Sequence, residues 1–241
     1  MTEPTPRFFV TGATGYTGRH VVSIARELGI DTVAHVRPDS RSLADWQERF
    51  SALGATVDTS PWTDEAFAAA LQAHRPTHVF ALLGTTRARK AKGMGSAVAE
   101  TYEAVDYGLS ALLLRACALL ETPPTYVFLS SLGVKPGTRN AYMAARAKLE
   151  AELREGSVPW LIVRPSFISG DDRDEKRIGE RVASVIGDAA FSALRAFGAR
   201  DAHARFRTRS GEELGRNVVD AALYATPGSE LDGPQLDALA R

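Results

Sequence analysis

The stretch "RFFVTGATGYTGRHVV", residues 7–22, joins an apolar run to a helical pattern through a glycine-rich turn. In a dinucleotide-binding βαβ unit, glycines at such positions permit the tight turn, let the backbone approach a pyrophosphate, and let the helix pack closely on the sheet. The N–H groups at the N-terminus of the helix attract phosphate. We therefore expect this turn to bind a dinucleotide, with a purely structural glycine turn as the alternative. The predicted cofactor loop consists of Gly12, Ala13, Thr14, Gly15, Tyr16, Thr17 and Gly18.

Short β-rich runs alternate with longer helical patterns along the rest of the chain. The β-rich runs are "DTVAHVR", "ATVD", "THVFALLG", "TYVFLSS" and "PWLIVRP". Most of them are continuously apolar, which is typical of strands covered on both faces. Strand–helix repetition with right-handed crossovers gives a parallel sheet between two layers of helices. We predict an α/β fold: a doubly wound, mainly parallel Rossmann sheet with helices on both faces.

The chain is less regular after about residue 166. It contains a helical pattern, "GEELGRNVVDAALYA", and the run "PQLDALA", which we expect to form a last short strand. This part is too short for an independent domain of ordinary size. We therefore predict a single NAD(P)-binding domain over residues 1–241, in which residues 166–241 contribute the substrate cleft.

Composition narrows the class of partner. The chain has 29 Lys and Arg residues and 29 Asp and Glu residues, so its formal net charge is zero and gives no long-range attraction to nucleic acid or an anionic membrane. A small-molecule partner is the better expectation. The polar first ten residues, the single Cys117 and the lack of an apolar run of roughly 20 residues predict a cytoplasmic protein without a membrane span. The histidines show no metal-ligand spacing, so we expect no metal site.

The end of the second β-rich run bears on which dinucleotide is bound. Enzymes that use NAD usually place an acid there to hold the ribose hydroxyls, but here the sequence reads "VAHVRPDS", with Arg37 at the tip. An arginine can pair with a 2′-phosphate. Asp39 is an alternative acid of the NAD type, and a solvated surface role is the alternative for Arg37. We predict that NADP(H) is preferred over NAD(H).

Several motifs together resemble a known family. "TGATGYTGRHV" is similar to the N-terminal signature of the atypical branch of the short-chain dehydrogenase/reductase superfamily. More narrowly, "ALLGTTRARKAKG", "YEAVDYGLSALL", "FLSSLGV" and "RPSFISGDDRDEKR" resemble the Tat-interacting-protein oxidoreductase group. The resemblance covers most of the chain and implies an NAD(P)-binding Rossmann fold. None of these motifs names a substrate.

The resemblance implies three catalytic positions. They are Ser131, with Ser130 as an alternative, Tyr142, and Arg146 where the superfamily has the lysine of its Tyr-x-x-x-Lys motif. Tyr142 and Arg146 are four residues apart and share a helical face. An arginine keeps the positive charge that favours a phenolate but replaces a compact ammonium with a planar fork. Pairing of Glu150 with Arg146 at i+4 would weaken the effect of that charge on Tyr142.

Other cofactor contacts follow strand ends, because loops at the carboxyl ends of strands approach the ligand in open α/β sheets. These predicted contacts are Asp58, Leu83, Gly84, Thr85, Pro165 and Phe167, besides Tyr142 and Arg146 themselves. Of these, Asp58 beside the adenine and the "RPSF" segment beside the nicotinamide are what the resemblance implies. Arg164 is expected to be a structural ion-pair partner, and Asp106 to support the active-site loop.

Two function hypotheses remain from the sequence. The first is an NADPH-dependent oxidoreductase that transfers hydride between the nicotinamide and a small carbonyl or hydroxyl compound, with Tyr142 as proton donor or acceptor. The second is an NADP(H)-binding regulator or scaffold with little or no catalysis, because Arg146 replaces the expected lysine. A sugar-nucleotide epimerase is weaker, because the C-terminal part is short for a nucleotide-sugar domain. Analogy with relatives also allows a homodimer.

Overall fold

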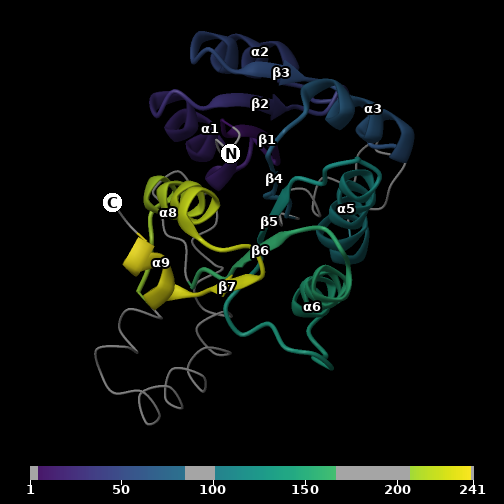
Figure 1. The fold of residues 1–241 in the computed structure, drawn as a ribbon, viewed down its shortest axis with the longest axis vertical. Helices are drawn as coiled ribbons and strands as arrows, with labels where there is room; N and C mark the ends of the chain where they lie inside the picture. The colour runs from purple at the N-terminus through teal and green to yellow at the C-terminus, as the bar shows by residue number, and fades with distance from the viewer. Residues whose placement is uncertain (1–4, 85–100, 167–206, 240–241) are drawn as a thin grey trace.

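A parallel sheet forms the centre of the molecule (Figure 1). The computed structural model describes residues 5–84, 101–166 and 207–239. The strands within these ranges are β1 (Arg7–Thr11), β2 (Asp31–His35), β3 (Thr56–Asp58), β4 (His78–Ala81), β5 (Thr125–Leu129), β6 (Trp160–Val163) and β7 (Ser229–Leu231). Their order is β3-β2-β1-β4-β5-β6-β7, and every neighbouring pair is parallel. The prediction of a doubly wound parallel sheet is confirmed.

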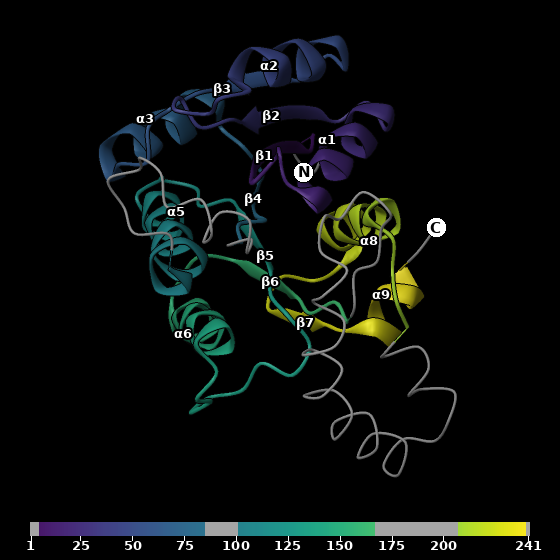
Figure 2. The ribbon, with the colours of Figure 1, turned by 180° about the vertical axis from the view of Figure 1, so that it is seen from behind.

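Helices cover both faces of the sheet, as Figures 1 and 2 show from opposite sides. They are α1 (Tyr16–Glu27), α2 (Leu43–Ala52), α3 (Asp64–His74), η1 (Tyr102–Leu109), α5 (Ser110–Ala118), α6 (Ala141–Glu155), α8 (Gly211–Tyr224) and α9 (Gly233–Leu239). η1 is a π-helical segment that continues directly into α5. Because strand side chains alternate between faces, Phe8 packs under α1, α2 and α8, whereas Phe9 packs under α3, α5 and α6.

The end of the chain corrects one expectation. "PQLDALA" forms α9 rather than a strand, and the last strand, β7, lies just before it as "SEL". Pro234 stands in the first turn of α9, where its missing N–H costs nothing. Gln235 accepts a hydrogen bond at 3.2 Å from the backbone N–H of Asp232, which closes the N-terminus of the helix. Local capping therefore outweighs the apolar residues that suggested a strand.

The carboxyl ends of the parallel strands lie at one edge of the sheet. The segments that leave this edge contain most of the predicted site residues, from Gly12 after β1 to Pro165 after β6. Residues 167–206, a large part of the segment predicted to contribute a substrate cleft, lie outside the described residues, as do Thr85 and Phe167. In the part of the chain that the structure describes, no helix has the length and apolar character to cross a bilayer.

Candidate cofactor and catalytic site

The glycine loop is built by close backbone approach. Gly12 has a φ of +72°, and a Cβ atom there would lie 2.4 Å from the carbonyl oxygen of Leu82, just after β4. A Cβ atom at Gly18 would lie 2.1 Å from the oxygen of Gly12. The N–H of Gly15 donates to that same oxygen at 2.9 Å. Only glycine fits at Gly12 and Gly18, because a side chain at either position would overlap the backbone.

The N-terminus of α1 differs from those of α3, α6 and α8. Side chains of Thr63, Asn140 and Ser210 cap those three helices. Gly15 caps α1 with no side-chain hydrogen bond, and the first turn contains no acid. Such an end keeps backbone donors and a partial positive charge directed at the carboxyl edge of the sheet. This arrangement fits the pyrophosphate of a dinucleotide.

Inside the loop, the side chains divide between the interior and the surface. Ala13 and Thr17 are buried, while Thr14 is half-buried. The hydroxyl of Tyr16 accepts a hydrogen bond at 3.2 Å from the N–H of Gly211, the first residue of α8. A Cβ atom at Gly211 would lie 2.5 Å from the Tyr16 ring. The side chain of Tyr16 therefore connects α1 to α8, a contact that the sequence pattern does not predict.

The two candidates for ribose recognition lie together after β2. Arg37 and Asp39 form an ion pair at 3.6 Å, and their side chains are 35% and 60% exposed. The positive group predicted for NADP(H) and the acid predicted for NAD(H) therefore face one another at the surface. An exposed pair of this kind is weak and can open for a ligand.

The carboxylate of Asp58, at the end of β3, has hydrogen-bond partners within the protein. Its carboxylate accepts hydrogen bonds at 3.0 Å and 3.2 Å from the N–H and hydroxyl of Ser60, and it lies 3.3 Å from His74 Nε2. Its side chain is only 10% exposed. These contacts hold the segment after β3 in place.

A stripe of polar residues at intervals of four runs along one face of α6: Tyr142, Arg146, Glu150 and Arg154. The first two lie together as predicted, with the guanidinium carbon of Arg146 4.5 Å from the centre of the Tyr142 ring. The ring of Tyr102, in η1, meets Tyr142 edge-on at 5.5 Å. Tyr142 is therefore placed by a cation on one side and an aromatic ring on another.

Arg146 is buried and paired. Its Nη2 donates to Asp106 Oδ1 at 3.0 Å, and its Nη1 donates to the carbonyl oxygen of Leu129, the last residue of β5. Asp106 is completely buried. A Cβ atom at Gly84, in the loop after β4, would lie 3.6 Å from Arg146 Nη2 and 3.8 Å from Asp106 Oδ1. The ion pair therefore lies directly beside the loop predicted to pass the cofactor.

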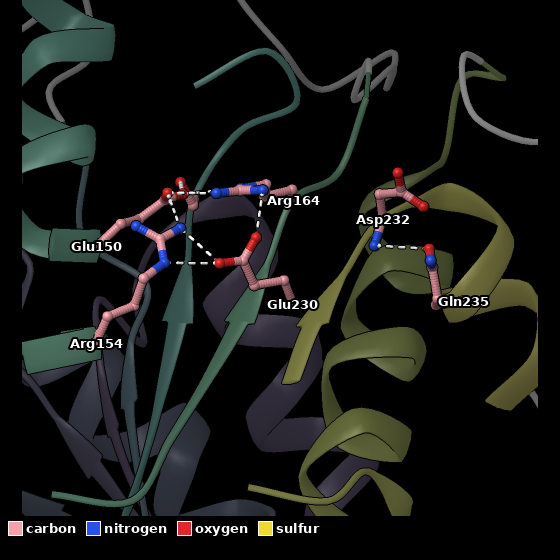
Figure 3. Close-up of polar contacts among 7 residues, drawn as sticks. Glu150, Arg154, Arg164, Glu230, Asp232 and Gln235 are labelled. Carbon is pink, nitrogen blue, oxygen red and sulfur yellow. Dashed lines mark hydrogen bonds and ion pairs between the residues drawn. The ribbon is translucent and has the colours of Figure 1, made fainter. Parts of the chain in front are cut away.

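Glu150 does not pair with Arg146, so the ion-pair alternative raised from the sequence is wrong. Glu150 lies one turn further along α6 and faces β6, where it accepts hydrogen bonds from Arg164 Nε at 2.9 Å and Arg154 Nη2 at 2.9 Å (Figure 3). Both arginines also bind Glu230 in β7. Arg164 is thus a structural ion-pair partner, as predicted. Burial raises the pKa of Glu150, but hydrogen bonds from Arg164 and the other donors outweigh burial and leave it lowered.

The same carboxylate distinguishes the two serines after β5. The buried Ser130 hydroxyl donates to Glu150 Oε1 at 2.6 Å, so it is committed to the ion-pair network. The Ser131 hydroxyl is half-buried and makes a long contact of 3.5 Å with the oxygen of Leu132. Ser131 is therefore the better placed of the two to meet a ligand.

Pro165, after β6, is buried, and its carbonyl oxygen accepts a hydrogen bond at 3.0 Å from the N–H of Leu132.

Comparison with known proteins agrees with this geometry. Residues 12–193 match the family described as NAD(P)H-binding. The chain belongs to this NAD(P)H-binding family. The match begins at Gly12, the first residue of the loop, and covers the segments that contain Tyr142 and Arg146.

Two relatives of this NAD(P)H-binding protein are called "Protein FMP52, mitochondrial". The one from Coccidioides immitis (strain RS) is 30% identical over 234 residues, which cover 94% of this chain and 89% of the relative. The one from Debaryomyces hansenii is 26% identical over 234 residues, covering 96% and 93%. Because both relatives are named as mitochondrial, the prediction of a cytoplasmic location is contradicted. Composition and the lack of an apolar run do not distinguish these compartments.

Solved structures share the fold at low identity. An oxidoreductase of the short-chain dehydrogenase/reductase family from Burkholderia thailandensis has a TM-score of 0.63 at 16% identity, covering 98% of this chain and 94% of that one. Yeast methylglyoxal/isovaleraldehyde reductase Gre2, complexed with NADPH, has a TM-score of 0.62 at 12% identity, covering 93% and 77%. These matches show a shared Rossmann fold, in agreement with the NAD(P)H-binding family match. The predicted atypical short-chain dehydrogenase/reductase fits this fold. The narrower Tat-interacting-protein group stays a prediction.

Proposed function

We propose that this protein binds NADP(H) and transfers hydride between the nicotinamide and a small carbonyl or hydroxyl compound, with Tyr142 as the proton donor or acceptor. The observation that carries the proposal is the position of Arg146 Nη2, 3.6 Å from the place of a Cβ atom at Gly84. This proximity places the α6 face with Tyr142 beside the loop after β4, which neighbours the Gly12 turn through Leu82. The bound nicotinamide would supply or accept the hydride.

Each part of the chain then has a distinct role. The N–H groups at the start of α1 hold the pyrophosphate, and Arg37 pairs with the 2′-phosphate after releasing Asp39. The hydroxyl of Ser131 orients the substrate oxygen, while Tyr142 gives it or takes from it a proton. Residues 166–241 contribute to the substrate cleft. A reductase of the same fold that binds NADPH supports this choice of cofactor.

Cofactor preference is tested by fluorescence titration with NADPH and NADH. We expect NADPH to bind at least about tenfold more tightly, a difference of about 1.4 kcal/mol. Arg37→Ala should remove this preference by weakening NADPH alone. Asp39→Asn is the matched control, because it breaks the same ion pair but keeps the cation, and it should leave NADPH binding intact. Tighter binding of NADH to the unaltered protein would overturn the assignment.

The role of Tyr142 is tested with Tyr142→Phe, using NADPH oxidation in the presence of a panel of aldehydes and ketones. Loss of the hydroxyl should lower turnover by about 10²-fold or more and leave NADPH affinity unchanged. Tyr102→Phe is the control, since it removes a hydroxyl from the neighbouring ring of the same pair. Equal turnover in Tyr142→Phe and the unaltered protein would remove Tyr142 from the mechanism.

The second candidate is a dinucleotide-binding regulator. It is favoured by the ion pair between Arg146 and Asp106, because a guanidinium committed to a buried carboxylate is a weaker activating cation than a free one. Tight NADPH binding without turnover of any carbonyl compound in the panel would support this candidate instead.

A further inference from the structure

Asp106 is a buried carboxylate that the proposed reaction does not use. Its side chain is fully buried in η1, a π-helical segment of a kind often found at functional sites. Burial of a charge is costly unless a partner compensates it, and Arg146 lies 3.0 Å away. This ion pair joins η1 to α6 in the interior.

The guanidinium of Arg146 does more than neutralise Asp106. Its second terminal nitrogen donates to the carbonyl oxygen of Leu129, and Ser131 follows only two residues later. The guanidinium carbon also lies 4.5 Å from the centre of the Tyr142 ring. A planar fork can make these contacts at once, whereas the single ammonium of a lysine has a different shape.

We propose that Asp106 is a positioning residue that acts through Arg146. It fixes the guanidinium, which in turn holds the side chains of Tyr142 and Ser131 in the positions needed for reaction. This inference rests on the proposed function, since it concerns the geometry of the proposed catalytic groups. Arg146 is then a support beneath the site rather than a cation extended toward the cofactor.

Two further contacts, nearer the surface, also hold η1 against α6, and one of them provides a control variant. Lys148 in α6 binds Glu103 in η1 at 2.8 Å, and Tyr107 in η1 donates to Glu152 in α6. We expect these contacts to remain when Asp106 is changed, so that the two helices stay attached. Glu103→Gln removes an ion pair between the same two helices at the surface and leaves the buried pair intact.

A double-mutant cycle tests whether Asp106 acts through Arg146. We expect Asp106→Asn and Arg146→Met each to lower kcat by about tenfold to a hundredfold, with NADPH affinity changed less than about threefold. The double variant should be no slower than the slower single variant, because both changes remove the same interaction. Glu103→Gln should keep the original kcat. Independent, multiplying effects of the two changes, or an unchanged kcat in Asp106→Asn, would overturn the proposal.

A second measurement needs neither turnover nor cofactor. Tyrosines are labelled with 3-fluorotyrosine, and the ¹⁹F signal of Tyr142 is identified by its loss in Tyr142→Phe. Asp106→Asn should shift or broaden this signal, and Glu103→Gln should not. If the protein has no reductase activity, the proposed function fails while this signal still reports on positioning. An unchanged Tyr142 signal in Asp106→Asn would refute the positioning role on its own.

Discussion

The loop before α1 and the polar face of α6 lie at the same edge of the sheet but are built in different ways. The loop is built from backbone atoms: the N–H of Gly15 donates to the oxygen of Gly12, and Gly12 lies against the carbonyl group of Leu82. The α6 face consists of side chains whose partners lie far away in the sequence: Arg146 binds Asp106 across 40 residues, and Arg154 binds Glu230 across 76.

This difference determines how each region responds to change. At Gly12 and Gly18 the loop has no room for an added atom, because the nearest neighbours are backbone carbonyl groups that cannot rotate away. The α6 face shares its charges among several partners, so the loss of one partner leaves others in place. We therefore expect an abrupt response to substitution in the loop and a graded one on α6.

The largest effect is expected for Gly12→Ala. The alanine would have to adopt the positive φ of Gly12, and its methyl group would overlap the Leu82 carbonyl oxygen at 2.4 Å. Backbone strain and steric overlap together should lower the free energy of unfolding by about 4 kcal/mol and abolish NADPH binding. Urea denaturation and fluorescence titration measure the two effects.

Gly29→Ala is the control that separates backbone strain at a positive φ from steric overlap of the new methyl group. Gly29 has nearly the same φ, +74°, but nothing lies within 4 Å of the position of its Cβ atom. It should cost only about 1 kcal/mol of unfolding free energy and leave NADPH binding unchanged. Equal losses in the two variants would mean that the close approach to Leu82 is unimportant and that conformational strain explains the requirement for glycine.

An intermediate effect is expected for Glu150→Gln. The neutral amide would leave Arg164 and Arg154 without their shared buried charge and would disturb Ser130. Loss of one member of a buried ion pair should lower the free energy of unfolding by about 3 kcal/mol. Glu230→Gln is the control, because it changes the half-exposed acid of the same network and should cost less than about 1 kcal/mol.

The stability loss in Glu150→Gln should also depend on pH. The pKa of Glu150 is lowered in the folded protein, so its contribution to stability is complete above the pKa of an unfolded glutamate and is lost as the pH falls through the folded pKa. Unfolding curves collected from neutral to acidic pH should therefore converge for the unaltered protein and Glu150→Gln. A stability difference between them that does not change with pH would contradict a charge-based role.

The fold and the strand–turn–helix geometry of the glycine loop were predictable because both depend on local patterns. Continuous apolar runs mark the buried strands, and the spacing of Gly12, Gly15 and Gly18 after such a run marks the turn. The common location of the candidate residues that follow strand ends was predictable from topology alone, since parallel strands bring their carboxyl ends together.

The side-chain partners were not predictable in the same way. Glu150 has an arginine four residues before it and another four residues after it, and the spacing rule alone cannot choose between them. The choice depends on Arg164, which tertiary structure places beside Glu150. The partnership of Arg146 with Asp106 depends on the packing of η1 against α6. One missed signal was available: the spacing of Gly211 and Gly215 in "GEELG" favours close helix packing.

The smallest of the three effects concerns this last feature, which links the loop to a distant helix. A methyl group at Gly211 would lie 2.5 Å from the Tyr16 ring, whereas one at Gly215 would lie 2.7 Å from His20 Cβ. Each substitution should cost about 2 kcal/mol of unfolding free energy by overpacking. Only Gly211→Ala should also weaken NADPH binding, by about tenfold, because Tyr16 belongs to the loop. Equal NADPH affinities in the two variants would mean that the loop is fixed by its own backbone, and that α8 supports α1 without influencing the site.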